Sequence, residues 1–160
     1  MEPWLAGRFS HLAPIPRLLC CSLELSMTDV RRWTAPLSDA QLWQRHGEAG
    51  SAGFQLRHLA GSVDRLTTYA RQESLTAEQL AFLRGEAAAG ASKEELLAGL
   101  EESYAAAAAF AGSATDFESP RFIGRQRLET PLGVLLAHIA EHTQRHTGQL
   151  IVLCKFAGAR

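Results

Sequence analysis

The chain has 160 residues, a net charge of −1 and 46% hydrophobic residues, a composition typical of one globular domain. A nearly neutral chain lacks the strongly basic face that sequence-independent nucleic-acid binding requires, so we expect no nucleic-acid partner. No stretch approaches the roughly 20 apolar residues of a membrane-spanning helix, so we also expect no membrane partner. The three cysteines are odd in number and two are adjacent, which argues against a disulfide framework and favours a reducing compartment.

The first 16 residues predict an irregular arm, because they are punctuated by helix-breaking residues: Pro3, Gly7, Pro14 and Pro16. The arm also carries apolar side chains that should pack on the rest of the molecule: Trp4, Leu5, Phe9 and Leu12. The prolines interrupt the apolar run that an export signal needs, so we expect a cytoplasmic protein. We therefore divide the chain into an arm, residues 1–16, and a helical domain, residues 17–160.

Apolar residues at intervals of three and four predict four long helices. The first begins near residue 16 or 17 and ends by residue 34, before Pro36. The second covers about 52–72. The third begins with the capping box Ser92–Glu95 and continues to about 111. The last opens at Thr130, as the N-cap, with Pro131 in the first turn, and continues to about 156.

The segments between these helices predict little further structure. Ser38–Gln41 is typical of a short capped turn, and residues 74–84 predict a short helix. Residues 46–53 contain three glycines and should form a loop. Residues 112–129 form a connection long enough to carry a wall or lid of a site. With no persuasive strand, the sequence predicts an all-α four-helix bundle with one or two short extra helices and a long connection before the last helix.

The last predicted helix carries histidines where its apolar stripe would be continued by Leu or Ile. Leu135 and Ile139 are followed on the same face by His142 and His146, one helical turn apart. Two imidazoles at this spacing can occupy two corners of a metal site. His138 extends the row, but its ends are about 12 Å apart, so one ion would take either 138 and 142 or 142 and 146. The apolar stripe favours the second pair.

A third metal ligand would have to come from another helix, and His58 in the second predicted helix is the candidate. His58 lies at the edge of that helix's apolar stripe, beside Phe54 and Gly61, and spacing alone does not show that it faces the pair. A glycine in the middle of a helix costs about 1 kcal/mol relative to alanine. Gly61 therefore indicates a close approach by another element.

Other interpretations of the histidines remain open at this point. Without a metal they would be core or interface side chains with hydrogen-bond partners, because an unsatisfied buried polar group costs about 1–3 kcal/mol. With a metal, the second nitrogen of each ring needs an acceptor nearby. The candidates for this supporting role are His138, Gln149, Asp64 and Glu141. Asp64 and Glu141 are also the candidates for a general base, whereas His11 and His46 lie in loop-like surroundings.

Two segments of the chain resemble the DinB-like (DinB/YfiT) superfamily, whose members are small bacterial four-helix bundles. The resemblance covers residues 17–157 and rests on Leu56–Gly61 and His142–Gln149, in the expected order and at about the expected distance. It implies that one divalent ion is held by three histidines, which in this sequence are His58, His142 and His146.

The sequence departs from the family pattern at two places. Thr147 stands where the family often has an arginine, and the stretch Gly50–Phe54 lacks the tryptophan that often precedes the second-helix histidine. These departures concern substrate contacts more than the metal ligands.

Three neutral imidazoles would leave open positions on the ion, which is the mark of a catalytic rather than a structural site. A divalent ion can lower the pKa of a bound water or thiol, and Zn, Ni or Fe(II) would all accept imidazole ligands. Characterised relatives include transferases and an isomerase that use small thiols such as bacillithiol or mycothiol. The resemblance therefore implies a metal-dependent thiol S-transferase or a related hydrolase, acting on a small thiol or electrophilic substrate in detoxification or stress response.

The alternative from a different class is a non-catalytic helical metal-binding or stress-related protein. An accessible cavity beside the metal would favour the enzyme, and a sealed site would favour the binding protein. In either case the apolar residues on four helices leave a stripe for a second copy, so we expect a homodimer. A third interpretation is a pH switch, because clustered histidines titrate near neutrality.

Overall fold

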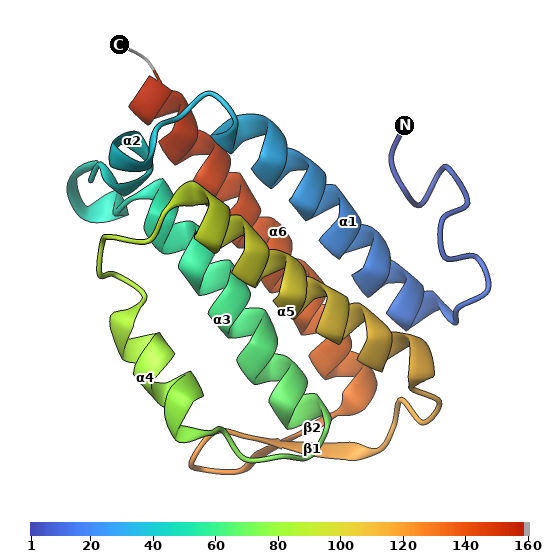
Figure 1. Cartoon of the computed structure of the whole chain (residues 1–160). Helices are drawn as coiled ribbons and strands as arrows, with labels where there is room; N and C mark the ends of the chain where they lie inside the picture. The colour runs from blue at the N-terminus through green and yellow to red at the C-terminus, as the bar shows by residue number, and fades with distance from the viewer. Residues whose placement is uncertain (159–160) are drawn as a thin grey trace.

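The computed structural model, which describes residues 1–158, contains four long helices packed side by side (Figure 1). These are α1 (Pro14–Thr34), α3 (Ala52–Ala70), α5 (Lys93–Ser113) and α6 (Leu132–Gly158). The shorter segments are α2 (Asp39–Trp43), the 3₁₀ turn η1 (Gly47–Ala49) and α4 (Ala77–Gly85). The predicted all-α bundle with short extra helices is confirmed. Within the described residues, no helix is both long and apolar enough to cross a membrane.

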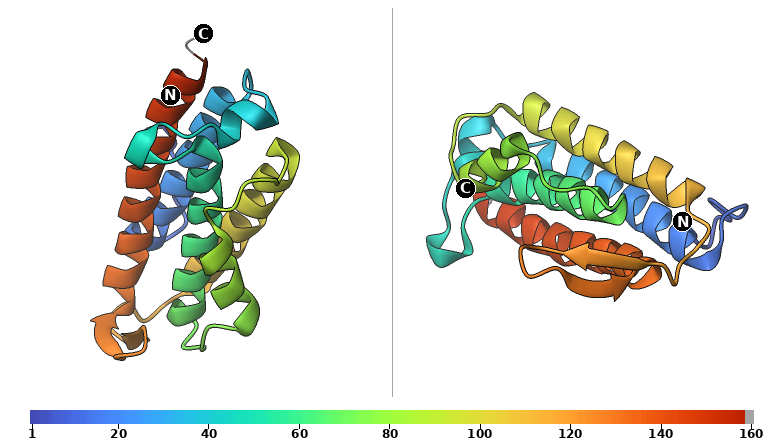
Figure 2. Two further views of the ribbon diagram at one scale, coloured as in Figure 1. Left: turned by 90° about the vertical axis from the view of Figure 1, so that its left-hand side faces the viewer. Right: turned by 90° about the horizontal axis from the view of Figure 1, so that it is seen from below.

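The four long helices form a square in which α1 and α3 each pack against both α5 and α6. Each helix contributes fully buried leucines to one shared core, including Leu19, Leu56, Leu100 and Leu150. The helices α3 and α5 run in the same direction (Figures 1 and 2). The chain therefore has to return from the end of α3 to the start of α5, and α4 forms this return on the outside of α3.

Side-chain caps fix where several helices begin. The Ser92 hydroxyl accepts a hydrogen bond from the backbone N–H of Glu95, which confirms the predicted capping box of α5. Ser38 caps α2 in the same way, again as predicted. A third capping box, at Thr76, starts α4 at Ala77 rather than near residue 74. At the first helix, the chain is already helical at Pro14, inside the expected arm.

The connection between α5 and α6 differs from the prediction. It contains an antiparallel hairpin, β1 (Pro120–Ile123) and β2 (Leu128–Pro131), where we expected no strand. Thr130 pairs with Arg121 in this hairpin, so it is not the N-cap of α6, which begins at Leu132. The buried guanidinium of Arg121 donates a hydrogen bond to the carbonyl of Ala70 at the end of α3, at 2.6 Å. This long-range contact, rather than a local sequence pattern, anchors the hairpin at the end of the bundle.

The N-terminal arm is attached mainly through polar contacts. Arg17 of α1 donates hydrogen bonds to the carbonyls of Trp4 and Arg8, at 3.1 and 3.2 Å. Arg8 in turn forms an ion pair with Glu24 at 2.9 Å. The side chains of Trp4 and Leu5 are 57% and 60% exposed, so these two apolar residues are not buried against the body.

Candidate metal centre

Three histidines from two helices converge where α3 and α6 pack together. His58 comes from α3, and His142 and His146 come from α6, and one ring nitrogen from each lies within 4.8 Å of the others. The Nε2 atoms of His58 and His142 are 3.2 Å apart. In a tetrahedral zinc site, with bonds of roughly 2.0–2.1 Å, two ligand nitrogens are about 3.4 Å apart. The nitrogens of His58 and His142 are therefore spaced as two ligands of one small divalent ion would be, and a nitrogen of His146 lies within 4.8 Å of both.

The outer nitrogen of His58 is held by a carboxylate. Its Nδ1 lies 2.8 Å from Oε2 of Glu86, just after α4. Because a carboxylate only accepts hydrogen bonds, His58 carries its proton on Nδ1 and presents the lone pair of Nε2 to the centre. Burial opposes the charge of Glu86, but hydrogen bonds from His58 and Arg65 outweigh it and hold the pKa of Glu86 below its usual value. The carboxylate is therefore charged at neutral pH.

The outer nitrogen of His146 is held by an amide. Its Nδ1 lies 2.9 Å from the side-chain oxygen of Gln55, a buried residue one turn before His58 on α3. The amide oxygen accepts the Nδ1 proton, so Nε2 of His146 is also free to bind an ion. Gln149, a predicted supporting residue, is exposed on α6, and its side-chain hydrogen bond to His146 opposes the lowering of that ring's pKa by burial. The supporting groups that sequence reasoning did not name are Glu86 and Gln55.

The surroundings keep the α6 histidines uncharged. Burial, followed by repulsion from His146 and His58, lowers the pKa of His142 from 6.5 to about 4. Burial, followed by the neighbouring His58 and Arg145, also lowers the pKa of His146. Both rings are therefore neutral at physiological pH, which is the protonation state that a metal ligand needs.

The other predicted supporting residues have different partners. His138 is about half exposed, and its Nδ1 lies 3.2 Å from a carboxylate oxygen of Glu141. Glu141 is also exposed and pairs with Arg145. Asp64 accepts a hydrogen bond from Gln79 of α4 at 2.8 Å. The structure therefore places Asp64 and Glu141 in contacts that fix helices rather than beside the three converging nitrogens.

One departure from the family pattern has a structural explanation. Thr147 is buried, its hydroxyl lies 2.7 Å from that of Ser26 on α1, and it also donates to the carbonyl of Thr143. Its side chain thus faces the core between α1 and α6. An arginine in this position would have to leave the core, whereas threonine joins a buried hydroxyl network.

The centre is only partly buried, and one aromatic ring beside it also lines a hollow. The ring of Phe54 stacks on that of His58, with centroids 5.6 Å apart. Phe54 is also one wall of a hollow of about 270 Å³, which the three histidines themselves do not line. The walls of this hollow come from the chain between α2 and α3, from the start of α3, and from the segment after α4: Trp43, Arg45, Glu48, Ala49, Gly50, Ser51, Phe54, Ala87 and Ala89.

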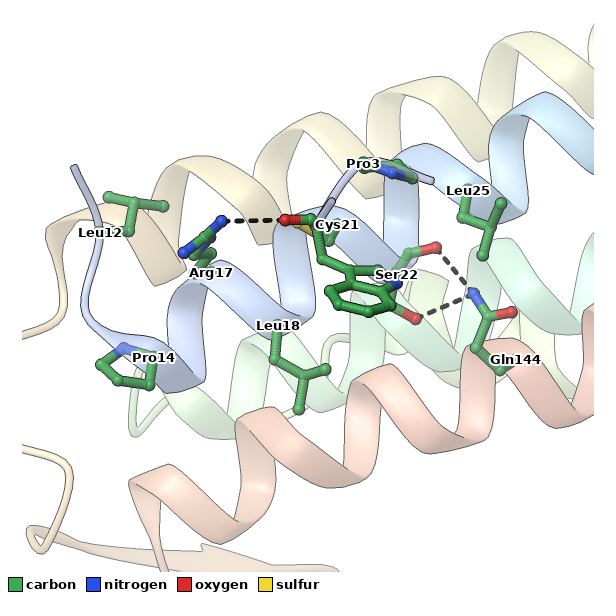
Figure 3. A pocket seen from close by; sticks show the side chains of 10 residues that line it. Pro3, Leu12, Pro14, Arg17, Leu18, Cys21, Ser22, Leu25 and Gln144 are labelled. Carbon is green, nitrogen blue, oxygen red and sulfur yellow. Dashed lines mark hydrogen bonds between the residues drawn. The ribbon is translucent and has the colours of Figure 1, made fainter. Parts of the chain in front are cut away.

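A larger hollow, of about 550 Å³, lies on a different side of the bundle (Figure 3). It is lined by the N-terminal arm and α1, with Gln144 as its residue from α6. Gln144 donates hydrogen bonds to the carbonyl and hydroxyl of Ser22, so this wall is fixed to α1. None of the three converging histidines lines it. It also lacks Phe54, which stacks on His58, and it shares no lining residue with the smaller hollow.

The fold and the centre together define a four-helix bundle with three histidines from two helices at one point. The sequence matches the DinB superfamily over residues 22–150, and the chain belongs to this family. A DinB-like protein from Bacillus cereus has a similar solved structure, with a TM-score of 0.64 and 15% sequence identity over 83% of this chain and 86% of that one. At this identity the likeness shows the fold alone. No protein with a curated description matches the sequence.

Proposed function

We propose that this chain is a metal-dependent enzyme that joins a low-molecular-weight thiol to an electrophilic substrate, or hydrolyses a related one. The ion would be Zn, Ni or Fe(II), held by His58, His142 and His146. The observation that carries the proposal is the convergence of three histidine ring nitrogens, with Glu86 and Gln55 holding two of the rings by their outer nitrogens. When bound, such an ion lowers the pKa of a thiol or water and leaves positions open for it.

The chain's own cysteines do not supply the thiol. Cys20, Cys21 and Cys154 are all buried and free. Burial raises the pKa of each thiol, that of Cys154 to about 11, so none forms a thiolate at neutral pH. The nucleophile must therefore come with the substrates, which supports a small thiol or water. Free buried cysteines also fit the reducing cytoplasm that we propose as the location.

Access to the centre favours the enzyme over the non-catalytic metal-binding protein. The histidines are partly exposed, and the hollow beside Phe54 has room for a small molecule. Arg45 adds a positive charge to its wall, which would attract the carboxylate that small biological thiols commonly carry. A storage or structural site would instead be enclosed on all sides.

Metal content is the first test of this function. We expect about one divalent ion per chain in untagged protein, measured by plasma mass spectrometry after purification or after loading with Zn, Ni or Fe(II). Replacement of a ligand, in His58→Ala or His146→Ala, should remove the ion. His138→Ala is the matched control, because its ring is on the same helix but pairs with Glu141. The loaded protein should then consume a small thiol in the presence of an electrophile faster than His146→Ala does.

Two results would contradict the proposal in different ways. If the wild-type protein takes up no ion under any loading condition, the histidines are core or partner-binding groups. If it binds the ion but accelerates neither thiol transfer nor hydrolysis across a panel of electrophiles, the non-catalytic metal-binding protein is the better description.

We also propose that two copies of the chain form a homodimer over the face formed by α1 and the N-terminal arm. This face holds the larger apolar hollow, and Trp4 and Leu18 beside it are more than half exposed. Light scattering after gel filtration should give the mass of two chains, and Leu18→Asp should give one. Leu83→Asp, at an exposed leucine of α4, should leave the dimer intact. A wild-type monomer would exclude this assembly.

A further inference from the structure

Glu86 is a buried acid that joins a histidine and an arginine of α3. Its side chain is 4% exposed, and each oxygen has its own partner: Oε2 accepts from Nδ1 of His58 at 2.8 Å, and Oε1 accepts from Nη1 of Arg65 at 2.7 Å. Removing a carboxylate from water is costly unless hydrogen bonds and an opposite charge replace the solvent. Its position is thus determined by His58 and Arg65 together.

The helix α3 leaves space for this carboxylate at Gly61. A Cβ atom at this position would lie 2.7 Å from Nη1 of Arg65, 2.7 Å from Oε1 of Glu86 and 2.8 Å from Cε1 of Phe82. Any larger residue would therefore displace the ion pair or the aromatic ring above it. The mid-helix glycine therefore allows α4 and the residue after it, Glu86, to approach α3 closely.

The α4 segment, residues 77–88, is attached to α3 largely by polar contacts. The helix α4 itself has no buried residue. Arg57 of α3 donates from Nη1 to the carbonyls of Gly85 and Ala88, at 2.9 and 2.7 Å, on either side of Glu86 in sequence. At the other end of α4, Gln79 donates to Asp64. Of these links, the bond from His58 to Glu86 is the one that ends at the metal centre.

We propose that Glu86 is a positioning residue of the metal centre, and that the ion and the α4 segment stabilise each other through the His58–Glu86 hydrogen bond. The inference rests on the proposed metal site. The carboxylate fixes the tautomer of His58 with Nε2 facing His142 and His146. An ion on Nε2 withdraws electron density from the ring, which makes its Nδ1–H a stronger donor to Glu86.

This coupling must act in both directions, because a ligand that strengthens a contact is itself bound more tightly when the contact is present. The coupling would also affect the hollow beside Phe54, because Ala87 and Ala89, just after Glu86 in the chain, line one of its walls. Ion binding would therefore order one side of the space in which a substrate would lie. The Glu86 carboxylate is the link between the bound ion and this side of the hollow.

The first test is Zn²⁺ affinity, measured near neutral pH by competition with a chromophoric chelator. Glu86→Ala should weaken binding by roughly 10- to 100-fold, the usual effect of removing such a supporting group. Glu86→Gln keeps an acceptor for His58 and should recover part of the loss. Asp64→Ala is the matched control, because it removes another link between α3 and α4 without touching a histidine, and it should retain the wild-type affinity.

The second test is hydrogen exchange with and without Zn²⁺, and its first comparison uses the wild-type protein alone. In the wild-type protein, Zn²⁺ should slow exchange over residues 77–90 more than in the hairpin 120–131. Glu86→Ala should lose this extra protection, and Asp64→Ala should keep it. Equal Zn²⁺ affinity in Glu86→Ala and wild type, or no added protection of residues 77–90 in Zn²⁺-bound wild type, would overturn the inference and leave the metal site standing. A wild type that binds no Zn²⁺ would overturn both.

Discussion

At the scale of single residues, Gly61 is the position where helix propensity and site geometry oppose each other. Alanine is favoured over glycine in a helix by about 1 kcal/mol. At Gly61, however, the added methyl group would collide with the buried Arg65–Glu86 pair and with Phe82. We expect Gly61→Ala to lower the free energy of unfolding by about 1–2 kcal/mol, since displacing a partner from a buried charge outweighs the propensity gain. Urea denaturation measures the change.

The control for this prediction is Gly99→Ala in the middle of α5. An added Cβ there meets no atom within 4 Å, so the propensity gain should appear without a collision. We expect Gly99→Ala to stabilise the protein by about 0.5–1 kcal/mol. If Gly61→Ala stabilises the protein by the same amount, the Arg65–Glu86 pair moves aside at little cost and the close approach has no structural importance.

The residues of the site were predictable to different degrees. His142 and His146 could be paired from one helix, because a four-residue spacing brings side chains onto one face whatever the tertiary structure. His58 required the family resemblance, since spacing within a helix does not tell which neighbour it faces. Gln55 left a signal that was overlooked, a polar side chain one turn before His58. Glu86 gives no such sequence signal. It lies just after α4, outside the apolar pattern of any helix, and only the folded chain brings it to His58.

At the scale of elements, the long helices were predictable because their apolar stripes repeat over five or more turns and their starts carry capping residues. The hairpin was not, because its two strands have four residues each and are held by Arg121, which bonds to the end of α3. The predicted start of the last helix, with Thr130 as N-cap, was also wrong, because the hairpin includes that residue. Thr130 and Pro131 have the chemistry of a helix start, but pairing with β1 keeps them extended.

The place where α4 packs on the bundle also cannot be predicted from the local sequence pattern. Its helical character and its capping residues are encoded in the sequence, whereas its distance from the metal centre depends on where the chain after α4 returns to α3. Since α3 and α5 run in the same direction, this return must cross the full length of the bundle (Figure 1). The topology therefore decides that a residue far from His58 in sequence becomes its hydrogen-bond partner.

At the scale of the whole molecule, the neutral histidines make the metal-free fold sensitive to acid. His142 has a pKa of about 4 in the folded protein against 6.5 for an unperturbed histidine, and that of His146 is lowered too. Between these values the unfolded chain binds more protons than the folded one, so the free energy of unfolding must fall as the pH falls. We expect the urea midpoint of metal-free protein to decrease steadily as the pH is lowered from about 6.5 to 4.5.

His142→Gln separates this effect from general acid denaturation. Without the titrating ring, the urea midpoint should depend less steeply on pH over the same window, whatever the variant's stability at neutral pH. His11→Gln, at an exposed position in the arm, should keep the wild-type dependence. Glu86 does not account for the change in this pH window, because its pKa is lowered below 4.5. Its contribution to the free energy of unfolding is therefore lost only at more acidic pH. An unchanged slope in His142→Gln would mean that the ring titrates as in the unfolded chain, and that burial between α3 and α6 does not hold it neutral.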